Sequence, residues 1–206
     1  NKMEEKFERT SLLIGKDNME ILKNSHIAIF GLGGVGGQLI NLARTGISHI
    51  DLYDGDIVST SNINRQIIAS ERTVGKNKVD VAKEMILEIN PNCEVNTYNQ
   101  FLHSTDIEKI DFSKYQYVID CIDTVSSKLA IIKKCNQLNV NLISCLGTGN
   151  KLDGSKLEIT DIYQTSICPL AKVIRKEVRK LGIKKLKVCY SKEEPLKAVA
   201  SSEYGR

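Results

Sequence analysis

The segment H-I-A-I-F-G-L-G-G-V-G-G, residues 26–37, decides the fold expected for this chain of 206 residues. Its first five residues are mostly apolar and too few for a helix, so they predict a buried strand of a covered parallel sheet. A helix from about Val35 to Arg44 should follow the glycines and direct its free N–H groups at an anion. The pattern therefore predicts a strand–turn–helix unit that binds a nucleotide, with a glycine-rich turn that binds nothing as the alternative.

Each glycine has its own function in such a unit. Gly31 permits a tight turn, Gly33 lets the backbone approach a phosphate, and Gly36 lets the helix pack closely on the strand. Asp54 ends the next predicted strand, 23 residues after Gly31. This spacing favours an acid that accepts the ribose hydroxyls of a nucleotide, although an aspartate that caps a loop is the alternative and Asp56 could exchange roles with it.

The composition fits an ordinary globular domain and excludes several classes of protein. Hydrophobic residues make up 41% and charged residues 26%, and the net charge is +4. No apolar run approaches the length of a membrane span, and no signal-peptide pattern opens the chain. The six cysteines contain no C-x-x-C pair, so we expect reduced core thiols of a cytoplasmic protein rather than a structural zinc site, with Cys168 in a core or helix-cap position.

The hydrophobic patterns predict alternating strands and helices. Further strands are expected at 49–54, 93–98, 115–122, 141–145 and 156–162, and helices at 4–14, 18–23, 77–90, 106–109, 125–138 and 168–181. No packing pattern is evident after Tyr190. The prediction is an α/β, Rossmann-like fold with a mainly parallel sheet flanked by helices and with N-terminal helices.

A polar segment and two lysines add a predicted polyphosphate site. The segment S-T-S-N-I-N-R-Q, residues 59–66, supplies two amides and the guanidinium of Arg65 where a hydride-transfer enzyme would usually continue into a helix. Lys76 and Lys78 then occupy the first turn of the helix at 77–90, where the macrodipole disfavours cations. An anion that compensates both lysines is our interpretation, and simple solvation is the alternative.

Two more features bear on chemistry. Asp123 follows a predicted strand and could hold Mg²⁺ between phosphate oxygens, unless it merely caps the following helix.

The helix at 168–181 has an apolar face formed by Leu170, Val173, Ile174, Val178 and Leu181. Its other face and the loop after it carry eight cations and one acid: Lys172, Arg175, Lys176, Arg179, Lys180, Lys184, Lys185, Lys187 and Glu177. We interpret this excess as a surface that contacts a phosphate backbone rather than only a solvated face.

The motifs together resemble a known family. G-L-G-G-V-G-G, D-G-D, S-N-I-N-R-Q, V-G-K-N-K-V and C-I-D-T, in this order and spacing, resemble the adenylyltransferases related to ubiquitin-activating enzymes. The resemblance implies that ATP and Mg²⁺ are bound and that a carboxylate attacks the α-phosphate, giving an acyl adenylate and pyrophosphate. It implies a homodimer in which Arg9 of one subunit reaches the phosphates of the other.

The same resemblance assigns roles to residues. The nucleotide backbone would contact Gly31, Gly33, Gly34 and Gly36, and the ribose would contact Asp54 or its neighbour Asp56. The triphosphate would contact Asn64 (or Asn62), Arg65, Gln66 and Lys78, and Asp123 would hold the magnesium. We expect Arg9, Arg65, Lys78 and Asp123 to be catalytic.

Within this superfamily the chain is most similar to the tRNA threonylcarbamoyladenosine dehydratases. The motifs that carry this similarity are R-T-S-L-L-I-G, V-I-D-C-I-D-T, G-T-G-N-K-L-D, T-D-I-Y-Q-T-S-I-C-P-L-A and Y-S-K-E-E-P. The similarity implies ATP-dependent cyclisation of a modified adenosine beside the anticodon, with a tRNA surface at Lys172, Arg175, Lys176, Arg179 and Lys180. It also implies a single adenylation domain over 1–206 that lacks the C-terminal end of the family domain.

Three other functions stay open from the sequence. The first is an activator of a ubiquitin-like sulfur-carrier protein, for which a carrier or sulfur-transfer protein would be a partner. The second is a Rossmann dehydrogenase, and the third is a nucleotide-binding tRNA module without catalysis. No membrane partner is expected.

Overall fold

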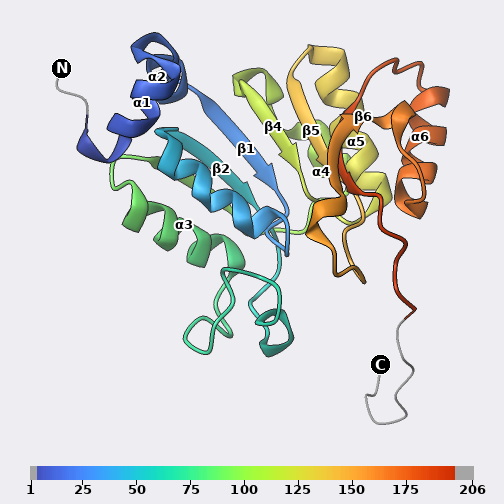
Figure 1. Cartoon of the computed structure of the whole chain (residues 1–206), viewed down its shortest axis with the longest axis horizontal. Coiled ribbons are helices and arrows are strands. Elements are labelled where there is room, and N and C mark those ends of the chain that lie inside the picture. The colour runs from blue at the N-terminus through green and yellow to red at the C-terminus, as the bar shows by residue number, and fades with distance from the viewer. Residues whose placement is uncertain (1–3, 198–206) are drawn as a thin grey trace. The chain divides into compact units, whose positions relative to one another are not determined.

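The computed structural model describes residues 4–197 (Figure 1). The α-helices are α1 (Glu8–Ile14), α2 (Lys16–Lys23), α3 (Lys78–Ile89), α4 (Ser104–Lys109), α5 (Val125–Leu138) and α6 (Pro169–Lys180). The strands are β1 (His26–Phe30), β2 (His49–Tyr53), β3 (Glu94–Tyr98), β4 (Tyr117–Asp120), β5 (Asn141–Cys145), β6 (Leu157–Asp161) and β7 (Lys187–Ser191). Short 3₁₀ helices are η1 (Glu5–Phe7), η3 (Thr60–Asn62), η4 (Phe112–Lys114), η5 (Gly154–Lys156) and η6 (Ile162–Gln164), and a longer one is η2 (Gly36–Thr45).

The chain divides into two compact units, one up to Ser144 and one from Cys145 onward. In the first unit the strands lie in the order β3-β2-β1-β4-β5, and all the pairs among them are parallel. In the second unit β6 and β7 pair antiparallel. The predicted Rossmann-like, mainly parallel sheet is therefore confirmed, while the single domain over 1–206 stays a prediction.

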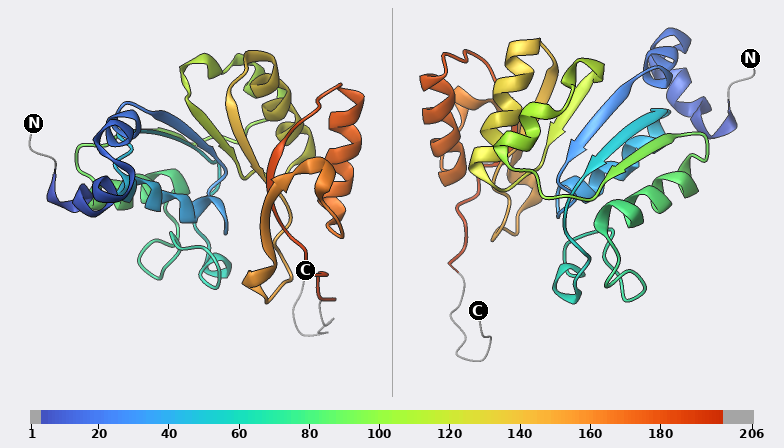
Figure 2. Two further views of the ribbon diagram at one scale, coloured as in Figure 1. Left: turned by 45° about the horizontal axis from the view of Figure 1, so that its top comes forward. Right: turned by 180° about the vertical axis from the view of Figure 1, so that it is seen from behind.

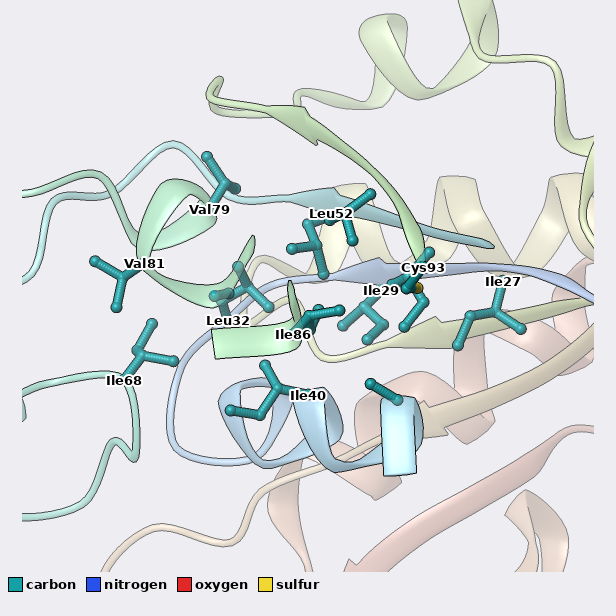
Figure 3. Packing of buried hydrophobic residues seen from close by; sticks show 14 of the residues in the cluster. Ile27, Ile29, Leu32, Ile40, Leu52, Ile68, Val79, Val81, Ile86 and Cys93 are labelled. Carbon is teal, nitrogen blue, oxygen red and sulfur yellow. The ribbon is translucent and has the colours of Figure 1, made fainter. Parts of the chain in front are cut away.

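Alternation along β1 explains the layers of the first unit. Ile27 and Ile29 belong to a core with η2 and α3, to which Ile40 and Ile86 contribute (Figure 3). The next residues along the strand, exemplified by Phe30, belong to a second core with α4, η4 and α5. Because successive side chains of a strand point to opposite faces, one apolar strand fills both cores. Figure 2 shows the helices of this unit on both sides of its strands.

Most predicted elements are confirmed, with three corrections. The helix after the glycine turn is a 3₁₀ helix, η2, whose first two residues, Gly36 and Gly37, are poor α-helix formers. The helix predicted over 4–14 is divided into η1 and α1 at Phe7, which is buried. Lys187 begins strand β7, which was not predicted, because its K-V-C-Y-S sequence follows a lysine-rich loop and is short.

The apolar face of α6 also differs from the prediction. Ala171, Ile174 and Val178 are buried, whereas Val173 and Leu181 are about half exposed. The buried positions follow the i, i+3, i+7 spacing of one helical face. The small side chain of Ala171 is therefore buried on this face, where the prediction had the larger side chains of Val173 and Leu181. The predicted cap position of Cys168 is confirmed, since its sulfur accepts the N–H of Ala171 at 3.4 Å.

A buried carboxylate lies near the amino ends of the parallel strands, away from the glycine turn. Tyr115 donates its hydroxyl to Oδ2 of Asp51 at 2.6 Å, and His26 Nε2 and Asn96 Nδ2 lie 2.9 Å from Oδ1. The ring of His49 stacks on that of His26, with centroids 3.3 Å apart. Burial alone would raise the pKa of Asp51, but these hydrogen bonds outweigh it and lower the pKa below its ordinary 3.8.

We expect this network to make the fold sensitive to acid. The lowered pKa of Asp51 contributes stability that is present above 3.8 and is lost as the pH falls through the lower, folded value. Burial and the neighbouring His26 also lower the pKa of His49, which acts in the same direction. Asp51→Asn should therefore show a flatter decline in the free energy of unfolding between about pH 7 and pH 2, measured by urea unfolding. The exposed Asp17→Asn is the control, and equal slopes in all three proteins would contradict the expectation.

Candidate active site

The glycine turn leaves β1 through a crowded backbone. Gly31 has a φ of +90°, and a Cβ on it would lie 2.7 Å from the carbonyl oxygen of Cys121. A Cβ on Gly36 would lie 1.7 Å from the carbonyl oxygen of Gly31. Side chains at these two positions are thus excluded by the fold, which matches the roles predicted for a tight turn and close packing.

Gly33 and Gly34 are less crowded, because a Cβ on either would make only ordinary van der Waals contacts. The nearest atom to a Cβ on Gly33 would be Nε2 of Gln66 at 3.9 Å, and for Gly34 it would be the carbonyl oxygen of Arg65 at 3.6 Å. The structure therefore brings the turn and the end of the 59–66 segment together, although 32 residues separate Gly33 from Arg65. Both glycines are partly exposed, so a ligand could approach the backbone of the turn here.

Asp54 is bonded to the glycine turn through its carboxylate. Its Oδ2 accepts the N–H of Leu32, inside the turn, at 2.6 Å, and its Oδ1 accepts the N–H of Asp56 at 2.8 Å. Burial raises the pKa of Asp54, although the hydrogen bonds from Asp56 and Leu32 and the charge of Lys78 oppose the shift. A carboxylate can accept about four hydrogen bonds, so two more donors, such as vicinal hydroxyls, could be accommodated.

Asp56 has a different position from Asp54. Its carboxylate accepts the ammonium of Lys78 at 2.9 Å, and its carbonyl accepts the N–H of the same lysine at 3.0 Å. The side chain of Lys78 is only 5% exposed, while that of Asp56 is half exposed. For Lys78, the anion that was inferred for the first turn of α3 is therefore the carboxylate of Asp56. Lys76 lies outside this arrangement, 3.7 Å from Glu84 on the surface.

The 59–66 segment is held by its own amides. Asn62 is buried and accepts the N–H of Ser59 at 3.0 Å, so it holds the segment together. Asn64 is exposed and accepts from the guanidinium of Arg65 at 2.9 Å, and Arg65 also donates to the carbonyl of Ser61. This geometry favours Asn64 over Asn62 for contact with a ligand.

Gln66 carries an unsatisfied polar atom. Its side chain is 94% buried, since only 6% of the residue is exposed, and its Oε1 has no hydrogen-bond partner among residues 4–197. Buried polar atoms are almost always paired, and an orphan often marks the position of a missing ligand or water. Sequence reasoning gave Gln66 no special weight beyond its motif, because burial cannot be read from the motif.

Asp123 is exposed at the carboxyl end of β4. It makes no hydrogen bond or ion pair in the described part of the chain, and the residue that caps α5 is Thr124. The alternative function as a helix cap is therefore not observed. This carboxylate follows two residues after Cys121, whose carbonyl packs against Gly31, and a carboxylate oxygen is the kind of ligand that Mg²⁺ prefers, so the residues present fit this ion.

The other predicted residues lie on exposed surfaces. Arg9 projects from α1, on which Leu12 and Leu13 are more than 80% exposed. On α6, Lys172 and Lys176 are exposed, while Arg175 donates to the carbonyl and hydroxyl of Thr165 at 2.6 Å. The remaining two cations have partners within the unit: Arg179 lies over the ring of Tyr163 and Lys180 pairs with Glu177.

No helix among residues 4–197 has both the length and the apolar character needed to cross a bilayer.

Comparison with known proteins places this geometry in a family. Residues 7–164 match the model of the ThiF family. The chain is 43% identical over 192 residues to a tRNA threonylcarbamoyladenosine dehydratase of Bacillus subtilis, covering 92% of this chain and 76% of the relative. It is 37% identical over 134 residues to the adenylyltransferase and sulfurtransferase MOCS3 of Drosophila sechellia, but covers only 29% of that protein.

A solved structure gives the same result. The crystal structure of the Escherichia coli tRNA N6-threonylcarbamoyladenosine dehydratase in complex with ATP superposes with a TM-score of 0.88 at 34% identity, covering 93% of this chain and 82% of that one. A second structure of the same enzyme holds AMP and gives a TM-score of 0.89. The chain belongs to the ThiF family and, within it, to the tRNA threonylcarbamoyladenosine dehydratases.

Proposed function

We propose that this protein uses ATP to dehydrate and cyclise threonylcarbamoyladenosine beside the anticodon of tRNA. The observation that carries the proposal is the partly exposed backbone of Gly33 and Gly34, next to which lie the carboxylate of Asp54, bonded to the turn, and the side chain of Gln66, whose Oε1 is unsatisfied. A nucleotide fits this arrangement because it offers hydroxyl donors to Asp54 and phosphates to the backbone of the turn. One relative of this chain is named a tRNA threonylcarbamoyladenosine dehydratase, and structures of the Escherichia coli enzyme of that name hold ATP and AMP.

The first step joins two substrates. The threonyl carboxylate of the tRNA attacks the α-phosphorus of ATP, an acyl–phosphate bond forms, and the bond to the β-phosphate breaks as pyrophosphate leaves. Negative charge moves onto the pyrophosphate, so cations fixed near it stabilise the transition state. Lys78 and Arg65 are the residues proposed to do this. Lys78 is buried, and its charge acts on Asp54, which is bonded to the turn. Arg65 lies against Gly34 of the turn.

Mg²⁺, held in part by Asp123, would neutralise phosphate charge when bound. In the second step the carbamoyl group closes onto the activated acyl carbon, AMP leaves, and the base has lost one water. The substrate supplies its own nucleophile, so no cysteine is required. Cys93 and Cys135 are poor candidates for a nucleophile, because burial raises the pKa of each thiol, to about 11 and about 12 respectively.

The assembly is part of the proposal. Arg9 is exposed on a short helix whose neighbouring leucines are also exposed, which supports a homodimer in which this arginine reaches the site of the partner. A tRNA substrate and an ATP-dependent reaction imply a cytoplasmic location.

The deciding experiment measures the product. The protein is incubated with ATP, Mg²⁺ and tRNA that carries threonylcarbamoyladenosine, and the digested nucleosides are analysed by mass spectrometry. We expect the modified nucleoside to lose the mass of one water. A sulfur-carrier activator would instead exchange pyrophosphate into ATP only with a protein ending in Gly-Gly, a dehydrogenase would be stabilised by NAD but not by ATP, and a binding module would leave the tRNA unchanged.

The α6 surface gives a prediction of its own for tRNA binding. Lys172 and Lys176 have exposed side chains, so replacing both by alanine should weaken binding. It should also reduce the slope of log K against log salt by about 1.4 to 1.8, since each of the two phosphate contacts contributes about 0.7 to 0.9. The matched control replaces Lys16 and Lys133, two exposed lysines of the first unit. An unchanged slope in the α6 variant would contradict a phosphate contact there.

A further inference from the structure

A buried ion pair lies beneath the segment that joins β4 to α5. Nζ of Lys128 lies 2.7 Å from Oδ2 of Asp120, and neither side chain is exposed. The hydroxyl of Ser144 donates to the same Oδ2 at 2.5 Å and lies 3.4 Å from Nζ. One carboxylate oxygen thus connects the end of β4, the first turns of α5 and the end of β5.

The second oxygen of Asp120 holds the start of the segment. Its Oδ1 accepts the N–H of Ile122 at 3.1 Å, while the N–H of Cys121 donates to the carbonyl of Phe30 at 2.7 Å. The carbonyl of Cys121 packs against Gly31, where a side chain cannot be accommodated. The backbone on this side is therefore fixed both to the ion pair and to the glycine turn.

The other end of the segment is fixed by the helix. The N–H of Lys128 donates to the carbonyl of Thr124 at 3.0 Å, so the residue whose ammonium binds Asp120 also forms the first turn of α5. Asp123, exposed and unpaired among the described residues, lies between these two fixed points. Its backbone has little freedom, although its own side chain makes no contact that would hold it.

Stability alone is a poor reason for such a pair. Removing two charges from water costs several kcal/mol each, and apolar residues of similar volume often stabilise a core equally well or better. What apolar residues cannot supply is directed, charge-assisted hydrogen bonds that fix the relative positions of three elements. A magnesium ligand needs this kind of fixation, because Mg²⁺ demands nearly ideal octahedral geometry.

We propose that Asp120, Lys128 and Ser144 are positioning residues that set the place of the Asp123 carboxylate for Mg²⁺ and do not themselves touch the nucleotide. The inference rests on the proposed function through the role of Asp123. This role distinguishes the buried network from ordinary core residues. Loss of the network should lower the affinity for the metal more than it lowers the affinity for the nucleotide.

The test measures metal binding directly. Mn²⁺ replaces Mg²⁺, a non-hydrolysable ATP analogue is present, and free Mn²⁺ is followed by electron paramagnetic resonance. Lys128→Met should raise the Kd for Mn²⁺ by about tenfold, the lower end of the cost for losing an outer-shell partner. The affinity for AMP without metal, measured by calorimetry, should stay within about twofold, because the glycine turn and Asp54 are unchanged.

A second variant and a control make the outcome decisive. Ser144→Ala removes the two hydrogen bonds of the hydroxyl and leaves the ion pair, so it should fold and raise the Kd for Mn²⁺ by about two- to fivefold. Lys134→Met removes another lysine of α5, whose Nζ donates to the carbonyls of Ile107, Glu108 and Ile110 at the end of α4. It should lower stability and leave metal affinity unchanged.

An unchanged Kd for Mn²⁺ in folded Lys128→Met overturns the proposal, and Ser144→Ala decides in the same way if Lys128→Met does not fold. An equal loss of AMP and Mn²⁺ affinity also overturns it, since that result means general loosening. Failure of the wild-type protein to dehydrate tRNA would remove the proposed reaction while leaving these binding measurements valid.

Discussion

Replacing Lys78 by methionine is expected to reduce adenylate formation by about three orders of magnitude. A unit charge near a protein surface interacts with an opposite charge at contact by about 4 kcal/mol, and each 1.4 kcal/mol in the barrier is a factor of ten. The side chain of Lys78 is almost fully buried, so in the methionine variant water cannot compensate for the lost positive charge. The fold should tolerate the change, because its partner Asp56 is half exposed and can be hydrated.

The measurement is single-turnover formation of the adenylated tRNA, quenched and quantified with labelled ATP. Lys76→Met is the matched control: it removes a lysine two residues earlier, which was predicted in the same turn but lies before the start of α3, is half exposed and is only loosely paired with Glu84. Its rate should stay within about twofold of the wild-type rate, as is usual for an exposed ion pair. Equal rates in the two variants would remove Lys78 from the reaction.

Asp123→Asn should abolish detectable dehydrated tRNA, with a loss of about 10² to 10³ in rate at saturating Mg²⁺. An amide oxygen is a much weaker ligand for Mg²⁺ than a carboxylate, whereas the shape of the side chain is kept. Stability should hardly change, because Asp123 is exposed and has no partner among residues 4–197. Binding of tRNA should also stay within about twofold, since the proposed tRNA contacts are made by α6.

Mass spectrometry of the nucleosides and a filter-binding titration of tRNA check the two parts separately. Asp111→Asn, which alters an exposed aspartate that caps η4, is the control and should retain activity. Full activity of Asp123→Asn would show that this carboxylate does not serve the metal, and joint loss of activity and tRNA binding would point to a misfolded variant.

The sequence was most informative where a residue type is forced by the backbone. The glycines at 31 and 36 occupy positions that exclude any side chain, so their spacing alone predicted the turn. Strand β1 was found because both of its faces are covered and its residues after His26 are continuously apolar. Short elements with mixed patterns were missed, of which β7 is the example, since two lysines and a serine flank its apolar residues.

Contacts between residues far apart in the sequence could not be predicted from the sequence. The first turn of α3 shows that Lys78 needs an anion, but nothing in the sequence indicates that Asp56, 22 residues earlier, supplies it. The same holds for the orphan oxygen of Gln66 and for the buried pair of Asp120 and Lys128, because burial depends on how the loops and strands assemble. Propensity and periodicity act locally and carry no information on such pairs.

The contact between Asp56 and Lys78 has a consequence for the catalytic cycle. Without nucleotide the ammonium is neutralised internally, so a phosphate that approaches Lys78 must first displace a tethered carboxylate. The tether keeps that carboxylate at a high local concentration, which weakens the grip on any single phosphate group. In the proposed reaction the same carboxylate would return once pyrophosphate has been cleaved from the α-phosphate and would help to expel it, so the lysine would alternate between two counter-ions.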